Sequence, residues 1–300
     1  MVNLSQLRVF VAVADAGGIR AASDRLARTP SAISMSLKQF EDEVQGVLFE
    51  GERKSRLTHF GQFVYDEARS LLTHSERVTR SINAFSNNGA GYIDAALLPS
   101  VAVVFLPEIM QRLLSDKPTI GIRIRDLDSR SVQEAVSRET AEMGVASYHP
   151  TSSVTYEALF SEPLHVVCRS EDPLCAIDRP LVRSDVSDRV FIGNNSYEPL
   201  VMPDFLAQTR QQRLHVLSTT SLLAIVQAGI GLTILPALSR HQSGSDLRFL
   251  PIADQNAKRT VYLLRNSERT LSPAAQLFAS VLRTVIAERA MSYGLSAVGG

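Results

Sequence analysis

Between positions 64 and 85 the apolar residues recur at alternating intervals of four and three, interrupted once by a serine: Val64, Ala68, Leu71, Ser75, Val78, Ile82 and Phe85. This repeat predicts a long helix with a narrow coiled-coil seam. Thr58 is suited to cap its start, and the stretch 86–91 ("SNNGAG") to end it. A single helix cannot bury such a seam, so we expect it to pair with a second copy. The alternative is that it packs on the chain's own C-terminal part.

This helix divides the chain of 300 residues into three predicted parts, 1–58, 59–88 and 89–300. The first part has the pattern of short helices followed by a small ribbon. Its first apolar repeat stops at Gly17-Gly18, and Thr29 with Pro30 begins another helix.

The helix that begins at Pro30 has two unlike faces. An apolar face forms the predicted core: Ile33, Leu37, Phe40 and Val44. Centred roughly 140° away, at 100° per residue, is a face of small hydroxyls, a methionine and a lysine. It consists of Ser31, Ser34, Met35 and Lys38.

Two helices joined by a tight turn, the second presenting short polar side chains, form a helix-turn-helix, whose second helix enters the DNA major groove. Hydroxyls bond bases or phosphates, methionine packs on a thymine methyl, and lysine reaches phosphate or guanine. We therefore predict DNA contacts from these residues: Arg28, Thr29, Ser31, Ser34, Met35 and Lys38. The alternative is a solvated face on an ordinary three-helix module.

A basic hairpin follows in "LFEGERKSRLT" (48–58), where Gly51 precedes Arg53, Lys54 and Arg56. We predict a wing whose basic side chains contact the DNA backbone or the minor groove. Residues 1–58 hold eight Lys and Arg against seven Asp and Glu. DNA contact would therefore depend on the placement of a few charges and on two copies acting together.

The whole chain has no net charge, with 31 basic and 31 acidic residues, so no overall field draws it to nucleic acid or membrane. No apolar run reaches the roughly 18 residues of a membrane span, and the N-terminus lacks the charged start of a signal peptide. Two cysteines do not make a disulfide framework. We expect a reduced, cytoplasmic protein without a membrane partner.

From Gly91 the pattern changes to strand, polar tip and helix, repeated, which predicts an α/β sheet with parallel strands. Two lobes are expected, with the chain crossing near Pro163 and returning near Asn266. The first lobe would hold about 91–163 and 266–300, and the second about 164–265.

Ligands bind beyond the carboxyl ends of strands in such sheets, often at helix N-termini. Hydroxyls and amides recur at those tips: Ser100, Ser129, Ser147, Asn194, Ser196 and Thr219. They predict a pocket for a small anion such as a carboxylate. Each residue alone is equally consistent with a simple helix cap.

The chain resembles the LysR-type transcriptional regulator family over nearly its whole length. "LRVFVAVA", "PSAIS", "LF" and "LT..G" match in the first part, and "LLPSVAVVFLP", "AGIGLTILPA" and "LSPAAQLFASVL" in the last. The resemblance implies an α/β fold class with an all-α, winged N-terminal domain. Its parts would be a winged helix-turn-helix, a linker helix and a two-lobed, periplasmic-binding-protein-like effector domain.

The resemblance also implies the partners: a pseudo-palindromic promoter site in double-stranded DNA, a small-molecule inducer between the lobes, and RNA polymerase. It implies a homodimer through the linker helix and a homotetramer. Thr29, Ser31, Ser34, Met35 and Lys38 fall on the family's DNA-facing positions. Ser100, Ser129, Asn194 and Thr219 fall near positions that line the inducer cleft.

Three positions depart from the family pattern. Gln45 replaces the usual glycine after the recognition helix, and Gly51 replaces the usual arginine after "LFE", where the wing is one residue short. Arg53 and Lys54 can restore the missing charge. Glu142 replaces the common aspartate.

Other classes of function have less support. The six histidines have no metal spacing, and the chain has no complete dinucleotide fingerprint, P-loop or nucleophile elbow. We therefore expect no enzyme, metal or cofactor. Two alternatives remain: a redox-responsive regulator using Cys168 and Cys175, and a cytoplasmic solute-binding module without a ligand-gated DNA role.

Overall fold

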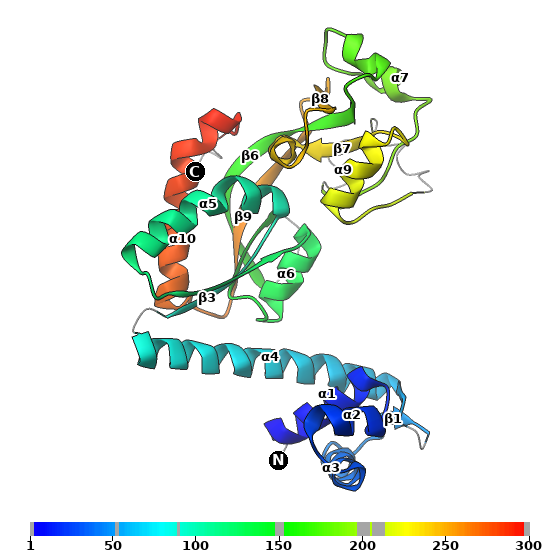
Figure 1. Cartoon of the computed structure of the whole chain (residues 1–300), viewed down its shortest axis with the longest axis vertical. Coiled ribbons are helices and arrows are strands. Elements are labelled where there is room, and N and C mark those ends of the chain that lie inside the picture. Colours follow the sequence, from blue (N-terminus) through cyan, green and yellow to red (C-terminus); the bar gives the residue numbers. More distant parts are fainter. Residues whose placement is uncertain are drawn as a thin grey trace. The chain divides into compact units, whose positions relative to one another are not determined.

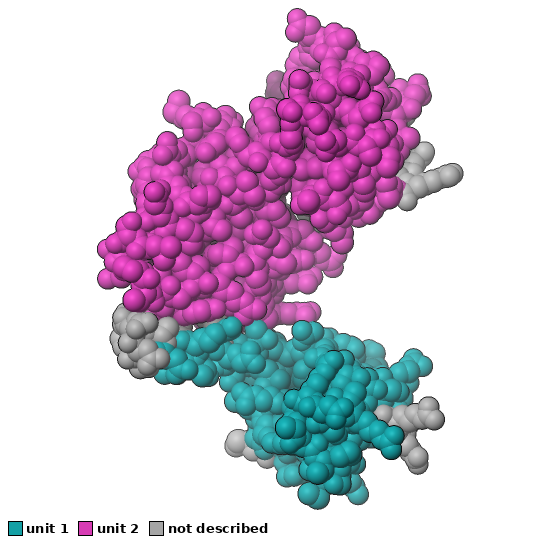
Figure 2. Space-filling model, viewed as in Figure 1, with its two compact units in different colours: residues 1–83 teal, residues 84–300 magenta. Residues whose placement is uncertain are grey.

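The computed structural model describes residues 3–51, 54–88, 91–147, 153–196, 205 and 214–296 (Figure 1). The chain splits into two compact units, residues 1–83 and 84–300, shown in separate colours in Figure 2. No helix within the described ranges is long and apolar enough to cross a membrane.

Unit 1 contains a helical domain with a two-stranded ribbon and most of a long helix. Its elements are α1 (Leu4–Ala16), α2 (Ile19–Leu26), α3 (Pro30–Glu43), β1 (Phe49–Glu50), β2 (Arg56–Leu57) and α4 (His59–Asn88). β1 and β2 pair antiparallel and form the ribbon expected for the wing.

Phe10 of α1 is the centre of the unit 1 core. Its ring lies 5.5 Å from the ring of Phe40 on α3 and 5.5 Å from that of Phe49 on β1. Tyr65 of α4 packs edge-on against it. One buried aromatic therefore fixes the positions of two helices and the ribbon relative to α1, and α3 presents its other face outward.

The apolar repeat of α4 is used in two ways. Val64 and Ala68 join the core of unit 1, so they are not free to form an intermolecular seam. Further along, Leu71 and Ile82 are exposed by 50% and 61%, and Val78 is exposed as well. The side chain of Phe85 lies outside the described part of the structure.

Unit 2 is built on one continuous sheet. Its helices are α5 (Pro99–Asp116), α6 (Ser129–Ser137), α7 (Arg183–Val186), α9 (Thr219–Gln227) and α10 (Pro273–Arg289), with short 3-10 turns η1 (Pro173–Ala176), η3 (Ala237–Gln242) and η4 (Ala290–Tyr293). Its strands are β3 (Tyr92–Leu97), β4 (Gly121–Asp126), β5 (Met143–Ser147), β6 (Val154–Arg169), β7 (Thr233–Pro236), β8 (Leu247–Pro251) and β9 (Lys258–Asn266).

The sheet runs in the order β4-β3-β5-β9-β6-β7, with β8 also on β6, among the strands that the structure describes. β3 is parallel to β4 and β5, as the alternating pattern predicted. β9 and β6 are antiparallel to their neighbours. They also carry the chain between two lobes, each with its own apolar core.

The chain passes from the first lobe to the second near Pro163, where β6 stops pairing with β9 and begins to pair with β7 and β8. The return crossing lies at the start of β9, at Lys258, and not near Asn266. The reason is that most of β9 pairs with β5 and so belongs to the first lobe. Strand periodicity alone does not reveal which neighbour a strand will pair with.

We expect Gly61→Ala to destabilise unit 1. Gly61 is buried in the first turn of α4, and a methyl group there would overlap the carbonyl oxygen of Leu48, which is backbone and cannot rotate away. The expected loss is about 1–3 kcal/mol in the free energy of unfolding, measured by urea denaturation. Gly244→Ala, which meets nothing within 4 Å, is the control. Equal stability of both variants would contradict this packing.

Candidate DNA interface and effector cleft

The outward face of α3 is formed as the sequence predicted. Ile33, Leu37 and Phe40 are at most 1% exposed, whereas Met35 is 73% exposed. Ser31, Ser34 and Lys38 are exposed beside Met35. Thr29 caps the helix by accepting a hydrogen bond from the Ala32 amide, and its hydroxyl lies 3.1 Å from that of Ser31. The N-terminal end of α3 thus presents hydroxyl groups, the helix dipole and a flexible apolar side chain.

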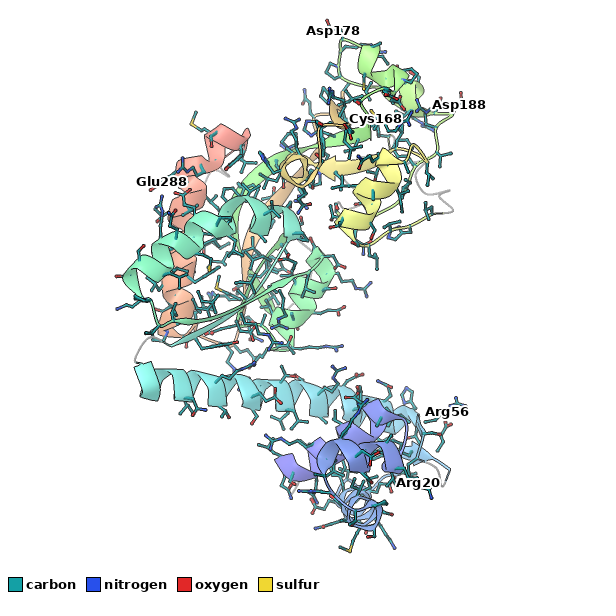
Figure 3. The ribbon with its side chains drawn as sticks, viewed as in Figure 1. Arg20, Arg56, Cys168, Asp178, Asp188 and Glu288 are labelled. Carbon is teal, nitrogen blue, oxygen red and sulfur yellow. The ribbon has the colours of Figure 1, made fainter. Side chains whose placement is uncertain are left out.

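The basic residues around this face differ in how free they are. Arg28 is exposed, with a long contact of 3.5 Å to the Ser5 hydroxyl. Arg56 points out from β2 (Figure 3), its side chain 81% exposed and loosely paired with Glu50. Arg53 lies outside the described residues. Arg28 and Arg56 can therefore turn toward a phosphate at little cost, because exposed ion pairs are weak.

Lys54 is placed differently from the other basic residues of the wing. Its ammonium lies 3.0 Å from both carboxylate oxygens of Glu41 at the end of α3. Glu41 also accepts a hydrogen bond from the Leu48 amide, which leads into the ribbon. Lys54 therefore connects the wing to the recognition helix, and its charge is largely neutralised. No local pattern in the sequence indicates this role of Glu41, because its partners lie 7 and 13 positions away in the chain.

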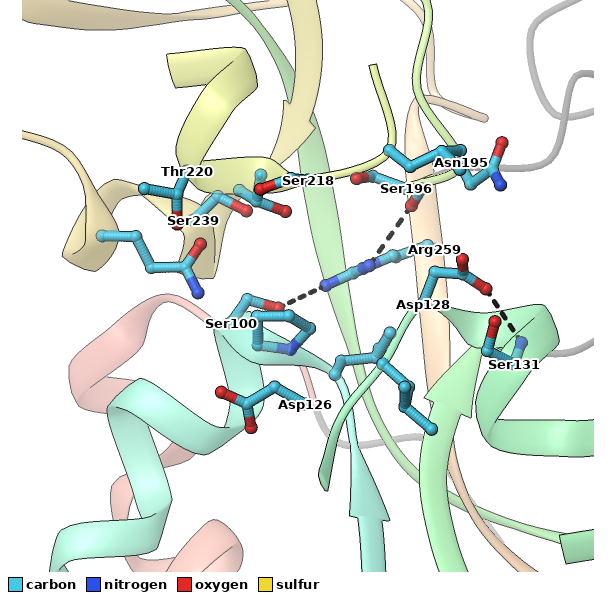
Figure 4. Close-up of a pocket in the computed structure, with 16 residues that line it drawn as sticks. Ser100, Asp126, Asp128, Ser131, Asn195, Ser196, Ser218, Thr220, Ser239 and Arg259 are labelled. Carbon is cyan, nitrogen blue, oxygen red and sulfur yellow. Dashed lines mark hydrogen bonds between the residues drawn. The ribbon is translucent and has the colours of Figure 1, made fainter. Parts of the chain in front are cut away.

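A cavity of about 400 Å³ lies in unit 2 between the two lobes (Figure 4). The first lobe contributes the tips after β3 and β4 and the turn η3, whose Leu238 joins the first lobe's core, and the second lobe contributes the start of α9 and the stretch after Asn194. The lining residues are Leu98, Pro99, Ser100, Asp126, Leu127, Asp128, Ser131, Asn195, Ser196, Leu217, Ser218, Thr219, Thr220, Ser239, Gln242 and Arg259. This volume suits a small molecule.

A buried ion pair forms the floor of the cleft. The Arg259 guanidinium on β9 bonds a carboxylate oxygen of Glu162 on the adjacent strand β6, at 2.8 and 2.9 Å. Both side chains are at most 5% exposed. Arg259 also donates to the Ser100 hydroxyl and to the backbone carbonyl of Ser196, and thus contacts both lobes. Of its five N–H donors, these four bonds leave one without a partner among the described residues.

The start of α9 adds further donors. The Ser218 hydroxyl caps the Ser221 amide. Helix geometry leaves the amides of Thr219 and Thr220 without an acceptor inside the helix. Figure 4 shows Ser218 and Thr220 on one side of the cleft, Ser100, Asp126 and Asp128 on the other, and Arg259 between them.

Three of the six residues predicted for this site line the cleft: Ser100, Ser196 and Thr219. The other three, Ser129, Ser147 and Asn194, are not among the lining residues. The Ser129 hydroxyl accepts a hydrogen bond from the Ser147 amide, and the Ser147 hydroxyl is buried without a partner among the described residues. Asn194 is buried, donating to Thr233 and Ile234 and accepting from Ser196. It fixes the chain that reaches the cleft.

The two cysteines lie together in the second lobe, their sulfurs 3.7 Å apart as free thiols. Burial, with the nearby Cys175, raises the pKa of Cys168 to about 12. That thiol is therefore protonated at neutral pH and is a poor nucleophile. The redox-responsive alternative stays a prediction.

A helix-turn-helix with a wing, joined to a two-lobed α/β unit with a cleft of ligand size, defines a DNA-binding transcriptional regulator with an effector-binding domain. Two family models match, "Bacterial regulatory helix-turn-helix protein, lysR family" over residues 4–62 and "LysR substrate binding domain" over residues 87–287. The chain belongs to the LysR family, whose members are transcriptional regulators and not enzymes.

Relatives match along nearly the whole chain. The uncharacterized HTH-type transcriptional regulator YbhD of Escherichia coli is 27% identical, covering 93% of this chain and 90% of its own length. The Hca operon transcriptional activator HcaR of the same species is 25% identical, covering 95% and 98%. Among solved structures, the LysR family regulator CbnR covers 95% of this chain and 99% of its own, with a TM-score of 0.74 at 20% identity. That structural likeness concerns the fold alone.

We expect Arg259→Met to destabilise unit 2, because it leaves the buried Glu162 carboxylate without its cation. Breaking such a pair costs about 3–5 kcal/mol in the free energy of unfolding, read from urea denaturation. The double variant Glu162→Gln/Arg259→Met should recover part of the loss. Arg283→Met breaks the exposed pair with Glu157 and should cost under about 1 kcal/mol. An Arg259→Met protein as stable as the parent would contradict the structural role of the pair.

Proposed function

We propose that the protein binds a pseudo-palindromic promoter site as a homodimer, and that a small carboxylate-bearing effector in the cleft changes this binding. The observation that carries the proposal is the contrast between the two faces of α3. A methionine exposed by 73% among serines, opposite a fully buried apolar face, is unusual for a merely solvated helix.

The DNA contacts we propose come from α3 and the wing. Ser31, Ser34 and Met35 would face base edges, while Thr29, Lys38, Arg28 and Arg56 would reach phosphates. Arg53 belongs to the same proposed set. For Lys54 we propose that it positions the wing, since its ammonium is held by Glu41.

The dimer we propose forms through the exposed apolar residues Leu71, Val78 and Ile82 of α4. Their spacing along the helix favours a second helix as the partner, and a twofold dimer carries two recognition helices to two half-sites. Assembly of dimers into a homotetramer and contact with RNA polymerase complete the proposal, by analogy with the family.

The effector site we propose is the cleft between the lobes. The free N–H of Arg259, the Ser100 hydroxyl and the α9 amides are donors on facing walls, and they suit a carboxylate. β6 and β9 are the connections that cross between the lobes, so an effector that contacts both walls stabilises one arrangement of them.

Alanine at Ser34, Met35 or Lys38 should weaken binding to a duplex from the protein's own upstream region. Lys38→Ala should weaken binding to all duplexes alike and reduce the magnitude of the slope of log K against log salt by about one. Ser34→Ala and Met35→Ala should instead reduce the difference in affinity between this duplex and random DNA. Lys117→Ala, an exposed lysine of unit 2, is the control. Fluorescence anisotropy over a salt series tests this, and variants that all bind like the parent would exclude this face.

Ser100→Ala should leave DNA affinity unchanged without effector and weaken the response to carboxylates. Loss of one hydrogen bond is worth about 1 kcal/mol, or roughly fivefold in the effector concentration needed. Anisotropy with a carboxylate panel measures it, with Ser115→Ala at the far end of α5 as the matched control. A response to hydrogen peroxide that Cys175→Ser abolishes, with none to carboxylates, would instead support redox regulation.

A further inference from the structure

We infer that the effector is amphoteric, with a carboxylate at one end and an ammonium group at the other. This rests on the proposed binding of a carboxylate in the cleft, and it follows from the charges on the cleft walls. A simple anion would fit only the donor side.

The described charged side chains at the cleft have a net negative charge. Asp126 and Asp128 line the cleft from the first lobe, and the buried Glu162 lies against Arg259. Within the described residues these three carboxylates face one guanidinium, which Glu162 already neutralises. A dianion would therefore meet a site of its own sign, which is unfavourable in a cleft only partly open to water.

Asp126 and Asp128 have not been neutralised by neighbouring cations. Arg125, next to Asp126, is turned to the buried Asp94 and to the Thr140 carbonyl. Arg130, beside Asp128, pairs with Glu134. Across the described ranges no cation is recorded within ion-pair distance of either aspartate.

The two aspartates still have acceptor capacity. One oxygen of Asp128 accepts the Ser131 amide at 2.8 Å as a helix cap, which leaves its second oxygen available. The exposed Asp126 has no recorded partner among the residues described. Two carboxylates on one wall can share an ammonium, which has three donors.

The η3 wall independently indicates a polar ligand. The hydroxyl-bearing Ser239 is only 2% exposed, lines the cavity, and has no hydrogen-bond partner among the described residues. The side-chain oxygen of Gln242, also in the lining, is buried and unpaired there too. Buried polar atoms normally have partners, and a ligand with polar groups in the cleft can supply them to these two side chains.

The arrangement gives the ligand an orientation. Its carboxylate lies at Arg259, Ser100 and the start of α9, and its ammonium lies toward Asp126 and Asp128, which Figure 4 shows on the wall opposite Thr220. Amino acids, with the amino group next to the carboxylate or further along a chain, have this chemistry.

The test uses the full-length protein in titration calorimetry. The probes are the common α-amino acids, 4-aminobutanoate and 5-aminopentanoate, each measured beside the acid that lacks its amino group. We expect the tightest-binding amino acid to bind at least about tenfold more tightly than its des-amino partner. Ser100→Ala should weaken the binding of both the amino acid and its des-amino partner. The ratio of the two affinities should stay unchanged.

Asp126→Asn and Asp128→Asn should each lower this ratio, and the double variant should bring it near one. Asparagine at 128 keeps the helix cap, so the change reports charge and not folding, which thermal denaturation checks. Asp178→Asn removes an exposed carboxylate remote from the cleft lining (Figure 3) and should leave the ratio unchanged.

The outcomes separate the two proposals. If the des-amino acids bind as tightly as the amino acids, or the double variant keeps the parent's affinity ratio, the proposed ammonium site is wrong. The proposed carboxylate site is then unaffected. If neither class binds, both the effector proposal and this inference fall.

Discussion

The pairing of Glu162 with Arg259 is the interaction on which the effector unit depends. The two residues face each other in register on β6 and β9, the strands that cross between the lobes. Glu162 also accepts the Leu238 amide of η3, while Arg259 reaches Ser100 and the Ser196 carbonyl. One buried pair therefore contacts both lobes at the point where they join. Any shift of one lobe against the other has to keep or exchange these bonds, because a buried charge left alone is costly.

The sequence predicted those features that depend on local periodicity. The two faces of α3 follow from side-chain spacing, and Thr29 and Pro30 mark its start through capping and a fixed φ angle. The long helix begins and ends where the apolar repeat and its flanking residues indicated. Ser100 was identified in the same way, because a hydroxyl at the start of a helix after a buried strand lies at the sheet edge where ligands bind.

Features that depend on pairing across the chain were not predictable from one sequence. Glu162 and Arg259 lie 97 positions apart, each within a strand, and no local pattern connects them. Ser129, Ser147 and Asn194 looked like pocket residues because they lie at strand tips. The Ser129 hydroxyl and the Asn194 amide are instead used by neighbouring backbone and side chains, and the buried Ser147 hydroxyl lies outside the cavity lining. The tip position places a polar group near a cleft, but its hydrogen-bond partners decide whether it faces the ligand or the fold.

The chain has no net charge, so its affinity for DNA depends on where a few basic side chains lie. In unit 1, Glu41 pairs with Lys54, so among the described residues of the proposed interface Lys38, Arg28 and Arg56 are the basic side chains left to reach phosphates. Since nonspecific affinity scales with the number of phosphates neutralised, we expect a single DNA-binding domain to bind weakly. In the proposed dimer, two weakly binding domains would make the affinity for DNA depend on how the two copies are held, and therefore on an effector that changes their arrangement. A strongly basic domain would bind in either state, and the effector could then change little.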